Sequence, residues 1–91
     1  MRVWCDFNAG VDDGRYVLNC VGTIEDLRRQ NIELQDGLAL TLYMDDPGDD
    51  GLIELTIVDA VVEAFHGHFV ARVRPGTWRH ETVPPAVPPA R

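Results

Sequence analysis

The sequence predicts a mainly β protein, a single small antiparallel five-stranded barrel or curled sheet with one short helix near residues 24–30. Three observations carry this prediction. Apolar and polar residues alternate over several short segments, which is the period of half-buried strands. Clusters of glycine, proline and aspartate separate those segments as turns do. A length of 91 residues is enough for one domain with one modest core.

The first two expected strands cover residues 2–8 and 15–21 and flank the turn-forming sequence AGVDDG. Each carries an apolar residue at every second position, so we expect them to pair as a hairpin with one apolar face. In that hairpin Cys5 and Cys20 are diagonal neighbours, about 7 Å apart. A disulfide needs Cβ atoms about 3.8 Å apart. The sequence therefore predicts two free, largely buried thiols.

Residues 22–31, GTIEDLRRQN, break the alternation and predict the helix. Thr23 is the expected N-cap, because Asp26 follows three residues later as in a capping box. The acidic residues precede a pair of arginines, an order that favours the helix dipole. The helix is expected over residues 24–30.

The second half of the chain predicts three further strands. LALTLYM, residues 38–44, alternates clearly and is followed by the loop DDPGDDG. Residues 52–65 exceed the usual strand length, so we expect a bend or bulge near Thr56–Asp59. Residues 68–74 return as the fifth strand, and Pro-Gly ends it.

The register of the last hairpin follows from its chemistry. A two-residue turn at His66-Gly67 sets Phe65 opposite His68 and gathers alanine and valine on one face, with acids and arginines on the other. A slip of one residue would mix the two faces. We therefore expect this register, with the sequence HGH at the hairpin tip.

Two metal sites are the alternatives to solvated turns in these segments. His66, His68 and His80 with a carboxylate would supply a zinc site only if they converged, and a hairpin tip need not bring them together. DDPGDDGLI resembles a calcium loop at Asp46 and Asp50, but an isoleucine stands where the bidentate glutamate belongs. Solvated turns are the expectation, with no metal and no cofactor.

The amino-acid composition restricts the classes of function that the protein can have. The net charge is −7, all eight basic residues are arginine, and an acidic protein is a poor ligand for nucleic acids or anionic membranes. The sequence has no serine, and core-facing thiols are normally inert, so we expect no enzyme. Arginine in place of lysine with abundant alanine and proline indicates a GC-rich bacterial genome. MRVWCDFN does not read as a secretory signal, which favours the cytoplasm.

The candidate binding residues are aromatic and arginine side chains, a composition typical of interface anchors. They are Trp4, Tyr43, Arg72, Arg74, Trp78 and Arg79. The main hypothesis is binding of another protein or a second copy of the chain. One alternative is a small anionic, nucleotide-type ligand held by the arginines and Trp78, and another is an acidic decoy or immunity protein that uses the carboxylates of residues 45–54. Trp78 could instead fold over the open end of the barrel and complete its core.

The stretch GTIEDLRRQNIELQDGLALTLYMDD resembles small uncharacterised bacterial proteins with an SH3-like or PilZ-like barrel. The resemblance implies a barrel domain over residues 1–81. Four prolines in the last ten residues predict an extended or disordered tail over residues 82–91. PilZ domains that bind cyclic di-GMP carry an R-x-x-x-R stretch and a D/N-x-S-x-x-G motif. This sequence has Arg28-Arg29 and no serine, so the resemblance implies the shape and not the nucleotide.

Overall fold

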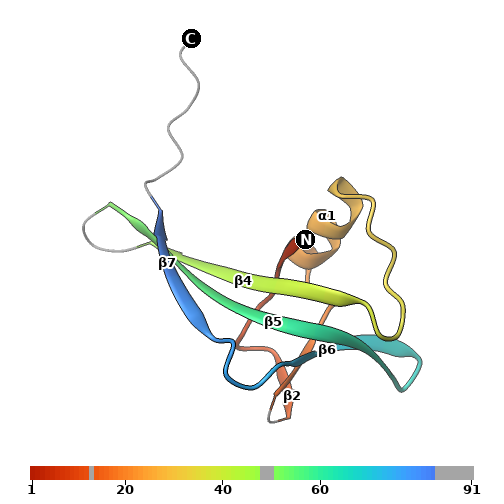
Figure 1. Ribbon diagram of the computed structural model, residues 1–91. Coiled ribbons are helices and arrows are strands. Elements are labelled where there is room, and N and C mark those ends of the chain that lie inside the picture. The colour runs from red at the N-terminus through yellow and green to blue at the C-terminus, as the bar shows by residue number, and fades with distance from the viewer. Residues whose placement is uncertain (13, 48–50, 84–91) are drawn as a thin grey trace.

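The computed structural model describes residues 1–12, 14–47 and 51–83, which form one sheet and one helix (Figure 1). The elements are β1 (Arg2–Trp4), β2 (Gly10–Asp12), β3 (Arg15–Val17), α1 (Val21–Arg29), β4 (Ala39–Pro47), β5 (Ile53–Phe65), β6 (His68–Val73) and β7 (Arg79–Val83). The mainly β class with a single short helix is confirmed for these residues. The prediction of five strands is wrong, since the sheet has seven, ordered β1-β4-β5-β6-β3-β2 with β7 also on β5. Its two terminal strands do not pair, so the sheet is open and not a barrel.

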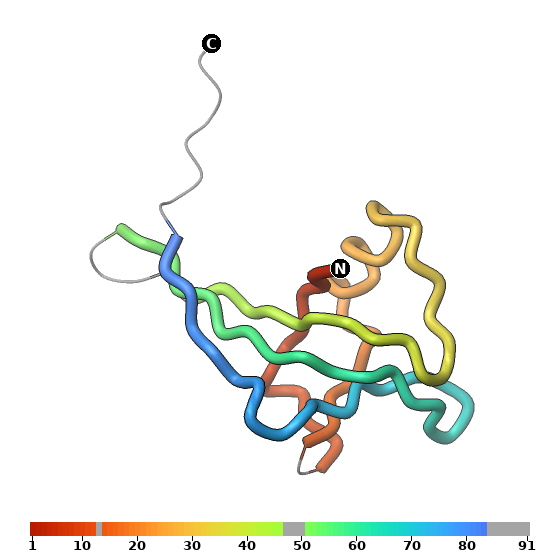
Figure 2. Tube along the Cα trace, in the orientation of Figure 1, coloured from red at the N-terminus to blue at the C-terminus, as the bar shows by residue number. Residues whose placement is uncertain are grey.

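The long strand β5 is the spine of the sheet. β4 pairs along one edge of it, from Ala39 opposite Val61 to Pro47 opposite Ile53, without any shift of register. The other edge is shared end to end, by β7 over residues 53–57 and by β6 over residues 60–65. Of the bend or bulge predicted near Thr56–Asp59, the bulge is therefore wrong, because the pairing with β4 shows no shift of register there. β5 is long because it pairs with two strands in succession along this edge, first with β7 and then with β6. Figure 2 shows the chain curving smoothly where the neighbour changes.

The hairpin of β5 and β6 has the predicted register. Phe65 lies opposite His68, and the pairing runs without interruption to Ala60 opposite Val73. Both turn residues have positive φ, 47° at His66 and 82° at Gly67, as the two central residues of a type I′ turn require.

The N-terminal segment departs from the predicted hairpin. β1 pairs parallel to β4, with Trp4 opposite Tyr43, and the strand expected over residues 15–21 is reduced to β3. An alternating pattern determines which side chains point inward but not which strand lies alongside. The apolar face of β1 was therefore predicted correctly, but the strand that pairs with β1 was not. Cys5 is fully buried, and both cysteines are free as predicted, although Cys20 is only partly buried.

The core lies between one face of the sheet and α1. Its buried residues are Val3, Cys5, Leu18, Leu27, Leu40, Leu42, Val58, Ala60, Val62 and Ala71. Alternation along β5 and β6 sends Ile57 and Val70 to the opposite face, where both are also fully buried. The opposite face of the sheet therefore also contains buried apolar residues, which lie beside charged side chains.

Helix α1 begins earlier than predicted. Its N-cap is Cys20, which makes no side-chain capping hydrogen bond, so the prediction of Thr23 as the cap is wrong. Thr23 lies inside the first turn and is fully buried. Its hydroxyl donates to the carbonyl of Trp4 at 2.7 Å and so is not left without a partner. Arg28 and Arg29 occupy the last turn, as expected.

At the C-terminal end of the described chain, β7 continues to Val83, past the domain boundary of 81 expected from the sequence. The rest of the proline-rich tail, residues 84–91, lies outside the described residues. In the described part of the chain, no helix has the length and apolar character needed to cross a membrane.

Candidate functional site

The edges of an open sheet expose unpaired backbone groups that invite pairing with another chain, so each edge of this sheet is informative. The free edge of β1 is covered by α1. The Trp4 N–H donates to Oδ2 of Asp26 at 2.8 Å, and the Trp4 carbonyl accepts from Thr23. The side-chain amide of Gln30 donates to the carbonyl of Arg2 at 2.7 Å. Side chains of α1 and of its C-cap, Gln30, thus take the place of a neighbouring strand.

Trp4 and Tyr43 belong to this helix-docking contact. The Tyr43 hydroxyl donates to Oδ2 of Asp26 at 3.1 Å, and Trp4 Nε1 donates to Oδ1 of Asp45 at 3.0 Å. A Cβ on Gly22 would lie 2.8 Å from the Trp4 ring, so the helix backbone packs directly on the indole. Burial, and secondarily the bond to Asp26, raises the pKa of Tyr43. Both aromatics are partly buried and bind α1.

The edge of β2 is weak for a different reason. This strand has three residues, and its pairing with β3 is irregular between Gly10 and Asp12. Short, irregular edge strands are poor templates for pairing.

The edge of β7 has neither form of protection. The strand has five residues and pairs regularly with β5 from Arg79 opposite Ile57 to Val83 opposite Ile53. Among the described residues, no group outside β5 forms a hydrogen bond with the β7 backbone. Residues 79–82 are exposed. Figure 1 shows β7 as the outermost strand at this side of the sheet.

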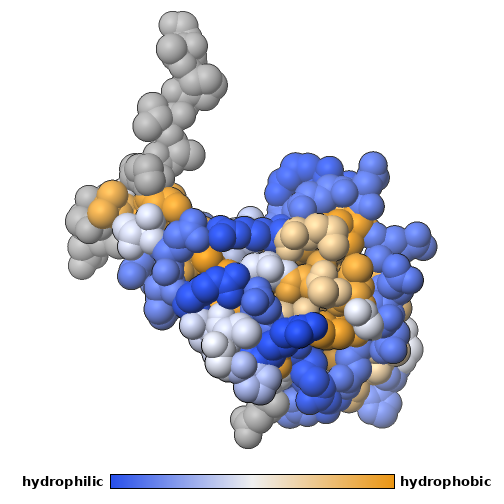
Figure 3. Space-filling model, viewed as in Figure 1, coloured by the Kyte–Doolittle hydropathy of each residue, from blue (hydrophilic) through white to orange (hydrophobic). Residues whose placement is uncertain are grey.

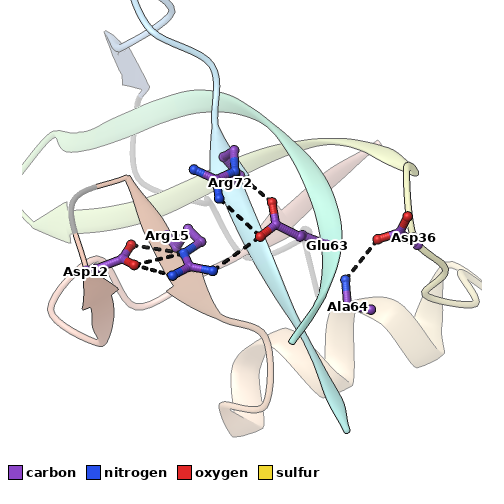
Figure 4. Close-up of polar contacts among 6 residues, drawn as sticks. All are labelled: Asp12, Arg15, Asp36, Glu63, Ala64 and Arg72. Atoms are coloured by element: carbon purple, nitrogen blue, oxygen red, sulfur yellow. Dashed lines mark hydrogen bonds and ion pairs between the residues drawn. The ribbon is translucent and has the colours of Figure 1, made fainter. Parts of the chain in front are cut away.

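The predicted arginine surface is largely paired with carboxylates. Glu63 accepts two hydrogen bonds from Arg72, at 2.6 and 3.1 Å, and one from Arg15 at 3.2 Å (Figure 4). Arg15 also bonds Asp12, and its guanidinium lies 4.5 Å from the centre of the Phe65 ring. The hydrogen bonds from Arg72 hold the pKa of Glu63 below its ordinary value. The result is a chain of alternating charges across four strands, β2, β3, β5 and β6.

The other two arginines lie further along the same region. Arg79 donates to Oδ1 of Asp59 at 3.1 Å, and this bond lowers the pKa of that carboxyl group. Arg74 borders an open depression of about 350 Å³ that Met1, Ala39 and Asp59 also line. This hollow holds the carboxylate of Asp59 beside the guanidinium of Arg74.

Trp78 lies elsewhere. Its ring meets Phe7 at 5.1 Å and Tyr16 at 6.3 Å, both edge to face, and 44% of the residue remains exposed. Tyr16 pairs with Ala71 in the sheet, so this aromatic cluster is on the face opposite Arg72. Trp78 therefore covers one end of the core and still presents an aromatic surface to solvent. The six candidate residues do not form one site.

The histidines are separated as expected for turn and edge positions. His66 and His68 are exposed at the hairpin tip, with ring centres 4.4 and 5.8 Å from Phe65, and His80 lies on β7 beside Thr56. Within the described ranges, no three histidine, cysteine or acidic side chains gather as metal ligands do. The calcium-loop interpretation depends on Asp50, which lies outside the described residues, as does Asp49, another carboxylate of the decoy hypothesis.

Sequence reasoning missed two surfaces. One is the β7 edge, because RHETV lacks an apolar face. The other is a mainly apolar groove of about 280 Å³ between α1 and the β5–β6 turn, lined by Leu18, Ile24, Leu27, Leu34, His68 and Phe69. No protein-family model matches the chain, and neither curated proteins nor solved structures give a significant match.

Proposed function

We propose that the protein is a non-catalytic protein-interaction module that receives an extended strand of its partner at the free edge of β7. The observation that carries the proposal is the contrast between edges. The fold covers the backbone of β1 with two side chains of α1 and with Gln30, the C-cap of that helix, and it shortens β2, but it leaves the five residues of β7 regular and open.

Strand addition supplies affinity through the backbone and selectivity through side chains. In β7, Arg79 and Glu81 point to one face, and His80 and Thr82 point to the other, because neighbours alternate along a strand. A strand opposite them meets alternating charges on one face. The partner surface should therefore combine an acidic and a basic residue two positions apart.

Apolar side chains next to the β7 edge are a second reason to expect a partner there. On the Arg79 face, Ile53 and Val83 lie opposite each other and are both partly buried. Figure 3 shows hydrophobic atoms at this end of the molecule, to the left of the main apolar patch. An added strand would cover part of these side chains and gain about 25 cal/mol for each Å² removed from water.

The arginines are less suited to a free anion. Arg72 and Arg79 already bond Glu63 and Asp59, and a small anion would have to displace a carboxylate from each. Protein binding makes no such demand, since exposed charge pairs commonly persist at the polar rim of an interface.

Proline substitution tests the edge directly. Adjacent residues of a strand direct their N–H groups to opposite sides, so one of His80 and Glu81 donates to β5 and the other faces the open edge. Proline at the outward position removes an edge donor and leaves the pairing with β5 intact. Peptides are selected against the wild-type protein from a random library, and their contacts are mapped by amide chemical shifts.

Selected peptides should perturb the amides of residues 79–83. His80→Pro or Glu81→Pro, whichever retains the wild-type circular dichroism and melting temperature, should abolish their binding. Proline at Val11 on β2 is the matched control and should leave binding unchanged. Peptide contacts that map to the groove between α1 and the β5–β6 turn, or binding that survives the outward proline, would reject β7 as the site.

A further inference from the structure

The charges along β7 are arranged so that the strand complements itself. Resting on the strand-addition function above, we propose that the partner is a second copy of this chain, with the two β7 strands antiparallel and His80 opposite His80 of the second copy. Such a contact is symmetric, so each interaction occurs twice.

Two registers keep the faces of the joined sheets continuous near the centre of β7. If His80 lies opposite His80, each Arg79 lies opposite Glu81 of the second copy. If Glu81 lies opposite Glu81, two carboxylates oppose each other and each Arg79 faces Val83. Opposite charges in directly facing positions stabilise a pair of strands, and like charges destabilise it. The charges therefore select the register centred on His80.

The intramolecular ion pairs of β7 extend this complementarity. Arg79 already bonds Asp59 at 3.1 Å, and Glu81 bonds Arg2 at 3.0 Å. The side chains of Arg79 and Glu81 are each 45% exposed, so both can accept a second neighbour. Pairing would align Asp59, Arg79, Glu81 and Arg2 in alternating charge across the interface. A network of this kind contributes more than isolated surface pairs do.

The same register accounts for the exposed aromatic beside β7. Continuing the pairing by one residue places Trp78 opposite Thr82 of the second copy. The 44% of Trp78 that remains in solvent would then lie against the added strand. A tryptophan anchor next to a polar rim is a common arrangement at protein interfaces. The five-residue edge is short, so the dimer should be weak and concentration-dependent.

Charge reversal gives a test that a structural role of the same residues would not mimic. Arg79→Glu makes both facing residues acidic, and Glu81→Arg makes both basic, so each variant should repel its own copy. A mixture of the two variants restores one acid opposite one base at both positions. Association is measured by sedimentation equilibrium over a wide concentration range. The buffer holds about 0.15 M salt, where a Debye length of about 8 Å limits repulsion between the net charges.

The wild type should show a monomer–dimer equilibrium, and each variant alone should dissociate at least about tenfold more readily. The equimolar mixture should regain the wild-type affinity. Arg28→Glu and Glu33→Arg, exposed positions away from β7, are the matched controls and should not alter association. If either reversed variant melts early, Arg79→Gln and Glu81→Gln replace the pair, and each should weaken the dimer.

Three results would overturn the proposal: a wild type that stays monomeric, a mixture that fails to recover, or a dimer that tightens when Glu81 is neutralised. The last result indicates the register centred on Glu81. A strict monomer that still binds selected peptides along residues 79–83 rejects the second copy and retains strand addition. A protein that does neither rejects both.

Discussion

Asp26 is the residue on which the docking of α1 depends most, and its removal should cause a large loss of stability. Asp26 is 5% exposed and accepts hydrogen bonds from the Trp4 N–H at 2.8 Å and from the Tyr43 hydroxyl at 3.1 Å. Asp26→Ala leaves both donors without this acceptor. Hydrogen bonds to a charged group contribute about 1.5–3 kcal/mol each, so the loss of two should be about 3–6 kcal/mol. The ion pair with Arg29 adds little, because that arginine is 67% exposed.

This loss of stability is large compared with the total free energy of unfolding. A chain of this length has a free energy of unfolding of about 5–14 kcal/mol. With an m-value of about 1.5 kcal/mol per M, the urea midpoint should fall by about 2–4 M. Asp26→Asn keeps one acceptor oxygen and should cost less than the alanine variant. Unfolding is followed by circular dichroism and by tryptophan fluorescence.

Asp36→Ala is the matched control. Oδ1 of Asp36 accepts from the N–H of Ala64 at 2.9 Å, but the residue is exposed, so water can replace the lost bond. Its midpoint should fall by less than half as much. Equal shifts for the two alanine variants would show that the carboxylate of Asp26 does not hold α1 to the edge of β1.

Three further predictions concern packing, charge and thiol chemistry. Gly22→Ala should destabilise the protein by about 1–3 kcal/mol and shift the Trp4 emission, because the added Cβ lies 2.8 Å from the indole; unchanged stability would mean that the ring moves freely. Hydrogen bonds from arginine lower the pKa of Glu63 from its ordinary 4.5, so its stabilising effect is complete above about pH 4.5 and is lost as the pH falls through the lower folded value. Glu63→Gln should therefore flatten the acid limb of the pH–stability profile, and an unaltered limb would argue against the charge chain. Burial raises the pKa of Cys5 to about 12, so a thiol reagent near pH 8 should modify Cys20 first and Cys5 only on unfolding; rapid modification of both in the native state would contradict the buried position.

The parts of the fold that could be predicted are those where both faces of a segment carry information. In the β5–β6 hairpin, alanine and valine occupy one face while Glu63 and Arg72 occupy the other, so one register satisfies both. The two free cysteines followed from the same reasoning about distances, although the strand assumed to pair with β1 was a different one. Local chemistry was sufficient wherever the partner strand was adjacent in sequence.

The parts that could not be predicted depend on long-range partners. The parallel pairing of β1 with β4 joins segments about forty residues apart, and alternation in β1 is equally compatible with either neighbour. β7 was missed because an edge strand with polar residues on both faces has no period-two hydrophobic signal. Thr23 was assigned to the N-cap because its composition fits a cap, whereas the docked strand draws its hydroxyl into the helix interface. The candidate site was accordingly assigned to residues that the structure distributes over both faces of the sheet.

Hydrogen exchange at low and high protein concentration tests the central claim, that two copies of the chain pair at the free edge of β7, most directly. The outward-facing amides of residues 79–83 should exchange rapidly in dilute protein and slow down markedly at high concentration. The amides of β2, which is also a terminal strand, should exchange at the same rate in both. Exchange along β7 that does not depend on concentration, or protection that appears on β2 instead, would contradict the account.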